Sequence, residues 1–109
     1  MNMKLISIEP PKIDYSPYRA YYLELIKSYE EALNSLPLDC EEDLREEAFD
    51  FLSYEIYKSA VNCLLSLKEL KKVASKELLD KLLECYREWC CYSGEPDYHH
   101  QNIVEVLES

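Results

Sequence analysis

The feature that most constrains the fold is the spacing of the apolar residues, which recur every three or four positions along the chain. In the first such stretch the apolar positions are Tyr18, Tyr22, Leu25, Tyr29, Ala32, Leu33 and Leu36. Steps of this length place side chains on one face of an α-helix. Ser16 suits the N-cap, Pro17 suits the first helical position, and Pro37 ends the pattern. We therefore expect an amphipathic helix over residues 16–36.

The same spacing predicts a second, longer helix that begins near residue 39. Asp39 and Glu42 have the separation of a capping box, with aspartate in place of serine or threonine. The inward positions are Leu44, Ala48, Leu52, Ile56, Ala60, Cys63, Leu67 and Leu70, and a second apolar row is formed by Phe51, Val61, Leu64 and Leu65. An apolar face this wide is typical of a helix placed centrally among its neighbours. Unless it breaks near Ser66, this helix runs to about residue 73, a length of about 50 Å.

Two further helices are expected in the last third of the chain. Ser75 suits the N-cap of a helix over residues 76–93, and Gly94 suits its end. Its inward positions are Leu78, Leu79, Leu82, Leu83, Tyr86, Trp89 and Cys90. After Pro96, helical spacing returns in a short segment with Ile103, Val104 and Leu107 inward.

These segments define the expected domain organisation and fold class. Residues 1–15 are expected to form a short extended arm, because Pro10 and Pro11 exclude helix there. Residues 16–109 are expected to form a single domain, since a chain of 109 residues holds one hydrophobic core. The predicted fold is all-α: an up-down bundle of three long helices plus a short C-terminal helix.

The negative net charge of the chain indicates which kinds of molecule it can bind. Acidic residues number 22 against 12 basic ones, which gives a formal net charge of −10. Direct binding of nucleic acid normally needs a basic surface, so we expect none, whereas a basic protein partner is favoured. The longest apolar runs are too short to cross a membrane, and the first residues lack the pattern of a signal peptide. We therefore expect a cytoplasmic protein without membrane contact.

Acidic residues are densest at the start of the second expected helix. They are Asp39, Glu41, Glu42, Asp43, Glu46, Glu47 and Asp50. Acids in a first helical turn stabilise the helix by about 0.3–1 kcal/mol each, which accounts for those up to Asp43. Glu46, Glu47 and Asp50 lie beyond that turn. We interpret the set as a candidate docking face for a basic protein, recognised by electrostatic complementarity.

The segment CYREWCCYSGEPDYHH, residues 85–100, raises the question of a metal or redox site. Zinc sites usually draw cysteines from a CxxC pair, or two ligands spaced i and i+4 on a helix. Cys85 and Cys90 are five residues apart, which turns the helix by about 140° between them. The spacing therefore favours a helix end with packed cysteines. Cys40 lies among carboxylates that oppose a thiolate, so no catalytic cysteine, metal or cofactor is expected.

Cys63 and Cys85 are predicted to be spatial neighbours. If the second and third helices form an antiparallel hairpin that turns at Ala74 and Ser75, Cys63 lies 11 residues before Ala74 and Cys85 lies 11 after it. Their Cα atoms would then be about 6–10 Å apart, and a disulfide needs less than about 7 Å. Two packed thiols are the alternative. A break at Ser66 would shift this register and undo the pairing.

No catalytic constellation is present in the sequence, so the expected function is protein–protein interaction, as an adaptor, a regulator or a self-associating module. Homo-association is expected because apolar residues on more than one row of a helix leave surplus apolar surface. Two alternatives remain open. One is an acidic inhibitor that imitates nucleic acid and occupies the groove of a basic protein. The other is a metal or redox protein built on residues 85–100.

Overall fold

The structure of the chain is a computed structural model that describes residues 13–37, 42–92 and 98–109, apart from the side chains at 91 and 92. The described part contains five α-helices: α1 (Ser16–Ser35), α2 (Glu42–Asn62), α3 (Leu67–Val73), α4 (Lys76–Tyr92) and α5 (Tyr98–Glu108). A short 3-10 helix, η1 (Leu64–Ser66), lies between α2 and α3. No β-strand occurs within these ranges, and the expected all-α class is confirmed.

The bounds of α1 lie within one residue of those predicted, but Ser16 is its first helical residue and not its N-cap. The helix begins at Ser16 with Tyr15 in the N-cap position and a proline in the first turn. The carboxylate of Asp14 accepts hydrogen bonds from both the backbone N–H and the hydroxyl of Ser16, each at 2.9 Å. α1 ends at Ser35, two residues before Pro37, because proline disfavours helix in the residue before it.

The predicted N-cap of α4 is present in the structure. The hydroxyl of Ser75 accepts a hydrogen bond from the backbone N–H of Leu78 at 3.2 Å, which satisfies one of the free donors at the helix start. The predictions for Asp39, Gly94 and the arm before Ile13 fall outside the described residues.

Of the two possibilities for the second helix, an unbroken run to about residue 73 or a break near Ser66, the structure shows the break, which begins at Cys63. Its backbone is extended there, with φ −152° and ψ 96°. Asn62 and Ser66 are weaker helix formers than alanine or leucine, which lowers the cost of a break. α1 has only 20 residues and spans about 30 Å. A continuous helix would therefore carry Leu67 and Leu70 past its partner, whereas the break returns both to the core, fully buried.

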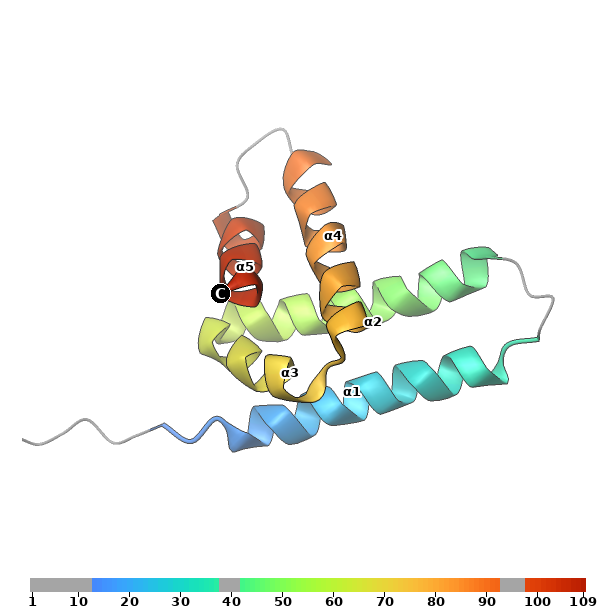
Figure 1. Ribbon diagram of the computed structural model, residues 1–109, viewed down its shortest axis with the longest axis horizontal. Coiled ribbons are helices and arrows are strands. Elements are labelled where there is room, and N and C mark those ends of the chain that lie inside the picture. The colour runs from blue at the N-terminus through green and yellow to red at the C-terminus, as the bar shows by residue number, and fades with distance from the viewer. Residues whose placement is uncertain (1–12, 38–41, 93–97) are drawn as a thin grey trace, which may run out of the picture.

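The break changes the architecture (Figure 1). α1 and α2 form one antiparallel pair, and α4 and α5 form a second antiparallel pair that runs steeply across α2. α3 packs against α1 and connects the two pairs. The expected up-down bundle of three long helices is therefore not confirmed, because α3 redirects the chain before α4 begins.

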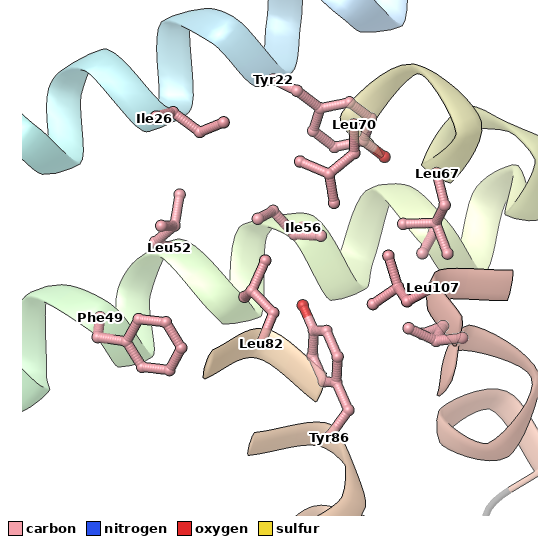
Figure 2. Close-up of a cluster of buried hydrophobic side chains, with 12 residues drawn as sticks. Tyr22, Ile26, Phe49, Leu52, Ile56, Leu67, Leu70, Leu82, Tyr86 and Leu107 are labelled. Atoms are coloured by element: carbon pink, nitrogen blue, oxygen red, sulfur yellow. The ribbon is translucent and has the colours of Figure 1, made fainter. Parts of the chain in front are cut away.

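All five helices contribute to one hydrophobic core, which lies where the two pairs cross (Figure 2). Its buried side chains are Tyr22, Ile26, Phe49, Leu52, Ile56, Ala60, Leu67, Leu70, Leu82, Tyr86, Ile103 and Leu107. Sequence spacing predicted most of these positions but missed Ile26 and Phe49. The opposite error occurs at four residues that were assigned to the apolar face of the second helix and are exposed: Leu44, Phe51, Val61 and Leu65.

A buried polar contact holds the break in place. The hydroxyl of Tyr22 donates a hydrogen bond to Ser59 Oγ at 3.0 Å. It also lies 2.6 Å from Ser66 Oγ, and both Tyr22 and Ser66 are fully buried. A single side chain of α1 thus joins the last turns of α2 to η1.

Candidate functional site

α2 and α4 line an acidic groove of about 340 Å³ where they cross. The residues around it are Glu46, Phe49, Asp50, Lys81, Glu84, Cys85, Glu88 and Trp89. Two carboxylates come from α2 and two from α4, and all four side chains are exposed. We call this feature the acidic groove.

Each of the two helices presents a pair of carboxylates to the acidic groove, because the members of each pair are one helical turn apart. Glu46 and Asp50 are four residues apart on α2, and Glu84 and Glu88 are four apart on α4, so each pair shares a helix face. The crossing of the two helices then brings the pairs together. The sequence singled out Glu46 and Asp50 but not the α4 pair. The i,i+4 spacing of Glu84 and Glu88 was visible in the sequence, but their meeting with α2 depends on the helix crossing.

One base lies among the carboxylates. Lys81 Nζ is 4.3 Å from the centroid of the Phe49 ring, which is a cation–π distance. With four carboxylates and one ammonium group, the lining carries a formal charge of −4 + 1 = −3. A groove with this charge attracts a cationic group, and its aromatic side chains offer apolar contact for the stem of lysine or arginine.

Cys85 lies in the acidic groove but lacks the environment of a nucleophile. Burial raises the pKa of its thiol, and the neighbouring carboxylates of Asp50 and Glu88 raise it as well. A hydrogen bond with Ser53 and the ammonium group of Lys81 act in the opposite direction without reversing the shift. Since the thiolate is the reactive form, Cys85 is held in its unreactive protonated form.

The predicted acidic docking face is divided by the structure. Glu46 and Asp50 face the acidic groove, whereas Glu47 lines a different groove between α1 and α2. Glu42 and Asp43 are exposed in the first turn of α2. The two remaining members of the predicted set, Asp39 and Glu41, lie outside the described residues.

Cys63 and Cys85 occupy different surroundings. Cys63 lies at the helix break beside Tyr18 of α1, whose pKa its thiol raises. Cys85 lies beside Ser53, in the middle of α2. Both are free thiols. The predicted proximity assumed a helix that continues to Ala74, and that assumption is wrong because α2 ends before Cys63.

The end of the cysteine- and histidine-rich segment forms an aromatic cluster. His100 of α5 is 9% exposed and stacks on Tyr57 of α2, with ring centroids 4.6 Å apart. Trp89 and Tyr86 of α4 lie beside it at 5.5 and 6.4 Å. Within the described ranges, no group of three or more histidine, cysteine, aspartate or glutamate residues is placed to hold a metal ion. The arrangement of these side chains is that of helix packing.

No protein-family model matches the chain, and comparison with curated proteins and with solved structures found no match. Among the described helices, none combines the length and the apolar character that a membrane span requires. The geometry and charge of the chain itself therefore carry the functional argument.

Proposed function

We propose that this chain is a non-enzymatic helical protein that acts by binding other proteins, and that its acidic groove receives a basic segment of a partner. The observation that carries the proposal is the convergence of Glu46 and Asp50 with Glu84 and Glu88 at one helix crossing. Nucleophilic chemistry has no comparable support, since the one thiol in this groove is kept protonated.

The groove suits a lysine- or arginine-containing segment in two respects. Exposed carboxylates on rigid helices steer a cationic partner and fix its register. Trp89 provides an aromatic face, on which an arginine guanidinium stacks more favourably than a lysine ammonium. Lys81 already lies over Phe49, so an incoming cation is expected to contact Trp89.

The acidic inhibitor that imitates nucleic acid is the second candidate. Exposed acids do continue from the groove to the start of α2 at Glu42 and Asp43, as such an inhibitor would need. The two candidates differ in which charges matter. A local docking groove depends on its own carboxylates, whereas an imitation of nucleic acid depends on charge spread over a wide surface.

A capture experiment with matched variants tests the proposal. The wild-type protein is immobilised, exposed to extract of its native cells, and the retained proteins are identified by mass spectrometry. The groove variant neutralises the groove without changing its shape: Glu46→Gln, Asp50→Asn, Glu84→Gln and Glu88→Gln. The control variant removes the same charge elsewhere: Glu24→Gln, Glu30→Gln, Glu31→Gln and Glu105→Gln, all at exposed positions.

We expect a basic protein that binds the wild type and the control variant, elutes with salt, and is lost with the groove variant. Equal loss with both variants would instead support the imitation of nucleic acid, especially for a nuclease or DNA-binding protein. Equal retention by all three proteins would show that the acidic groove is not the docking site.

A further inference from the structure

α2 carries a second, outward-facing row of large side chains, which we call the outer stripe. Its residues are Leu44, Glu47, Phe51, Tyr54, Lys58 and Val61, and all of them are exposed. The four apolar members expose 44%, 66%, 52% and 43% of their surface, in chain order. Large exposed apolar side chains gathered on one face mark an interaction surface, whereas single scattered ones are normal.

The outer stripe lies on the side of α2 that faces away from the core. At about 100° per residue, its centre is about 180° from the centre of the buried row that contains Leu52 and Ile56. α1 contacts α2 through Phe49 and Ser59, and α4 contacts it through Phe49 and Ser53. None of these contacts involves the outer stripe, although Tyr21 and Tyr29 of α1 border it.

The spacing within the outer stripe is that of a coiled-coil seam. Its residues alternate steps of three and four, so Leu44, Phe51 and Lys58 repeat at seven residues, and Glu47, Tyr54 and Val61 repeat likewise. An apolar repeat of seven residues is the pattern with which one helix packs along another. Only Glu47 and Lys58 interrupt it; they carry opposite charges, and within one copy Lys58 Nζ lies 2.8 Å from Glu55 Oε1.

The outer stripe is bordered by hollows in which the side chains of a second helix can sit. Leu44 and Phe51 line a largely apolar groove of about 450 Å³ with Tyr29 of α1. Lys58 lines a second groove of about 490 Å³ with Tyr21 of α1. A helix laid along the outer stripe would therefore also meet hollows that α1 and α2 line together.

We propose that the outer stripe binds the same stripe of a second copy of this chain, with the two α2 helices antiparallel. A twofold axis between Leu52 and Ser53 pairs positions whose numbers sum to 105. Leu44 then lies opposite Val61 of the second copy, Phe51 opposite its Tyr54, and Glu47 opposite its Lys58. Every apolar residue meets an apolar residue, and the two charges meet their opposites.

The charges of Glu47 and Lys58 favour the antiparallel pair of α2 helices over a parallel pair. In a parallel pair, each Glu47 would face the other Glu47 and each Lys58 the other Lys58, which is repulsive. The self-complementarity of the antiparallel pair is what an isologous twofold interface needs and what an unrelated partner has no reason to match. The inference goes beyond the proposed function, since none of the residues that line the acidic groove belongs to the outer stripe.

The net charge of −10 on each copy opposes association over long range. Salt screens this repulsion with a Debye length of about 10 Å at 0.1 M. The close apolar contacts are not screened. The dimer is therefore expected to strengthen between low and moderate ionic strength.

The test is sedimentation velocity on the wild type and on charge-reversed variants in about 0.15 M salt. The wild type should sediment as a dimer in reversible exchange with monomer. Glu47→Lys and Lys58→Glu each place like charges opposite one another, so each should weaken the dimer about tenfold or more. The double variant restores opposite charges and should associate like the wild type.

Mixing gives an independent check. A copy with Glu47→Lys and a copy with Lys58→Glu are each repulsive to themselves but complementary to one another, so the mixture should form a heterodimer. Glu105→Lys on α5 and Lys76→Glu on α4 change the same charges at exposed positions and should leave association unchanged. Circular dichroism confirms that each variant is folded.

Two outcomes would overturn the proposal. One is a wild-type monomer at both low and moderate salt. The other is a dimer that neither single reversal weakens, which would place the interface elsewhere on the molecule. The groove variant keeps every residue of the outer stripe and carries four fewer negative charges, so it should dimerise at least as tightly as the wild type. Failure of the dimer and failure of the acidic groove are therefore separate results.

Discussion

At the scale of single residues, the interior is held by a few polar contacts whose partners come from different helices. Tyr22 joins α1 to α2 and η1 through Ser59 and Ser66. Tyr86 of α4 is fully buried and donates a hydrogen bond to the backbone carbonyl of Ser53 at 2.8 Å. Buried polar groups are costly unless they are hydrogen-bonded, so each of these contacts fixes the position of its helix.

The first prediction concerns Tyr22→Phe, which removes the hydroxyl that Ser59 and Ser66 contact. Because Ser66 is fully buried, its hydroxyl is left without that partner, and we expect the free energy of unfolding to fall by about 1–3 kcal/mol. Urea denaturation followed by circular dichroism measures the change. Tyr21→Phe is the matched control, because Tyr21 is 40% exposed, and its effect should stay below about 0.5 kcal/mol. Similar effects of the two variants would contradict this account.

The second prediction concerns the pH dependence of stability at Glu69, which is 8% exposed. Its carboxylate accepts hydrogen bonds from Arg19 Nε at 2.8 Å and Lys72 Nζ at 3.1 Å. The bond from Arg19, followed by that from Lys72, holds the pKa of Glu69 below its usual range, against the effect of burial. A lowered folded-state pKa gives stability that is present above the unfolded-state pKa and is lost as the pH falls through the folded-state pKa.

Glu69→Gln should therefore lower the free energy of unfolding at pH 7 and make its decline below about pH 5 less steep. Urea denaturation at a series of pH values measures both effects. The exposed Glu30→Gln serves as the control and should leave the pH profile nearly unchanged. An unaltered slope in the Glu69 variant would show that the ion pair does not contribute to acid unfolding.

At the scale of elements, α2 is the helix around which the molecule is organised. One side packs into the core, a second side contributes to the acidic groove, and a third side carries the outer stripe. Because α2 carries apolar residues on two opposite sides, the sequence spacing predicted a helix surrounded by its neighbours. The error at Phe51 and Val61 arose because spacing shows which residues share a face, not whether another helix of the same chain covers it.

The third prediction concerns the start of α4, the helix that supplies Glu84 and Glu88 to the acidic groove. Ser75→Ala removes the acceptor for the backbone N–H of Leu78, and we expect the free energy of unfolding to fall by about 1 kcal/mol. Thermal and urea denaturation measure the change. Ser75→Asp keeps a capping acceptor and should remain close to the wild type. If alanine and aspartate behave alike, the cap does not stabilise α4.

At the scale of the whole molecule, two antiparallel helix pairs share one core at their crossing. Ile56 of α2 and Leu82 of α4 are both fully buried there (Figure 2). The crossing also creates the acidic groove, so the stability of the core and the geometry of the candidate site depend on the same packing.

The fourth prediction follows from that shared core. Ile56→Ala and Leu82→Ala should each lower the free energy of unfolding by about 2–5 kcal/mol, because each leaves a cavity. Leu23→Ala is the control, since Leu23 is 53% exposed, and its effect should stay below about 0.5 kcal/mol. Urea denaturation of all three variants measures the difference. A change below about 0.5 kcal/mol at Ile56 or Leu82 would mean that its helix is oriented differently.

The sequence by itself determined α1, α4 and α5 and much of the burial of the helices. Apolar spacing, Pro17, Pro37 and Ser75 placed α1 and the start of α4, and positions such as Ile56 and Leu82 were correctly assigned to the core. These features are local, because a helix face and a cap depend on residues within a few turns of one another. The shared helix face of Glu46 and Asp50 could be predicted in the same way, because it depends only on their spacing of four residues.

Only the tertiary structure decided where the chain turns and which faces meet. The break at Cys63 depends on the length of α1 and on the buried contact of Tyr22 with Ser66, residues separated by 44 positions. The joining of Glu84 and Glu88 to the α2 carboxylates, and the exposure of Phe51, both follow from that turn. Local spacing favours an uninterrupted helix, and the burial gained by folding Leu67 and Leu70 back into the core outweighs it.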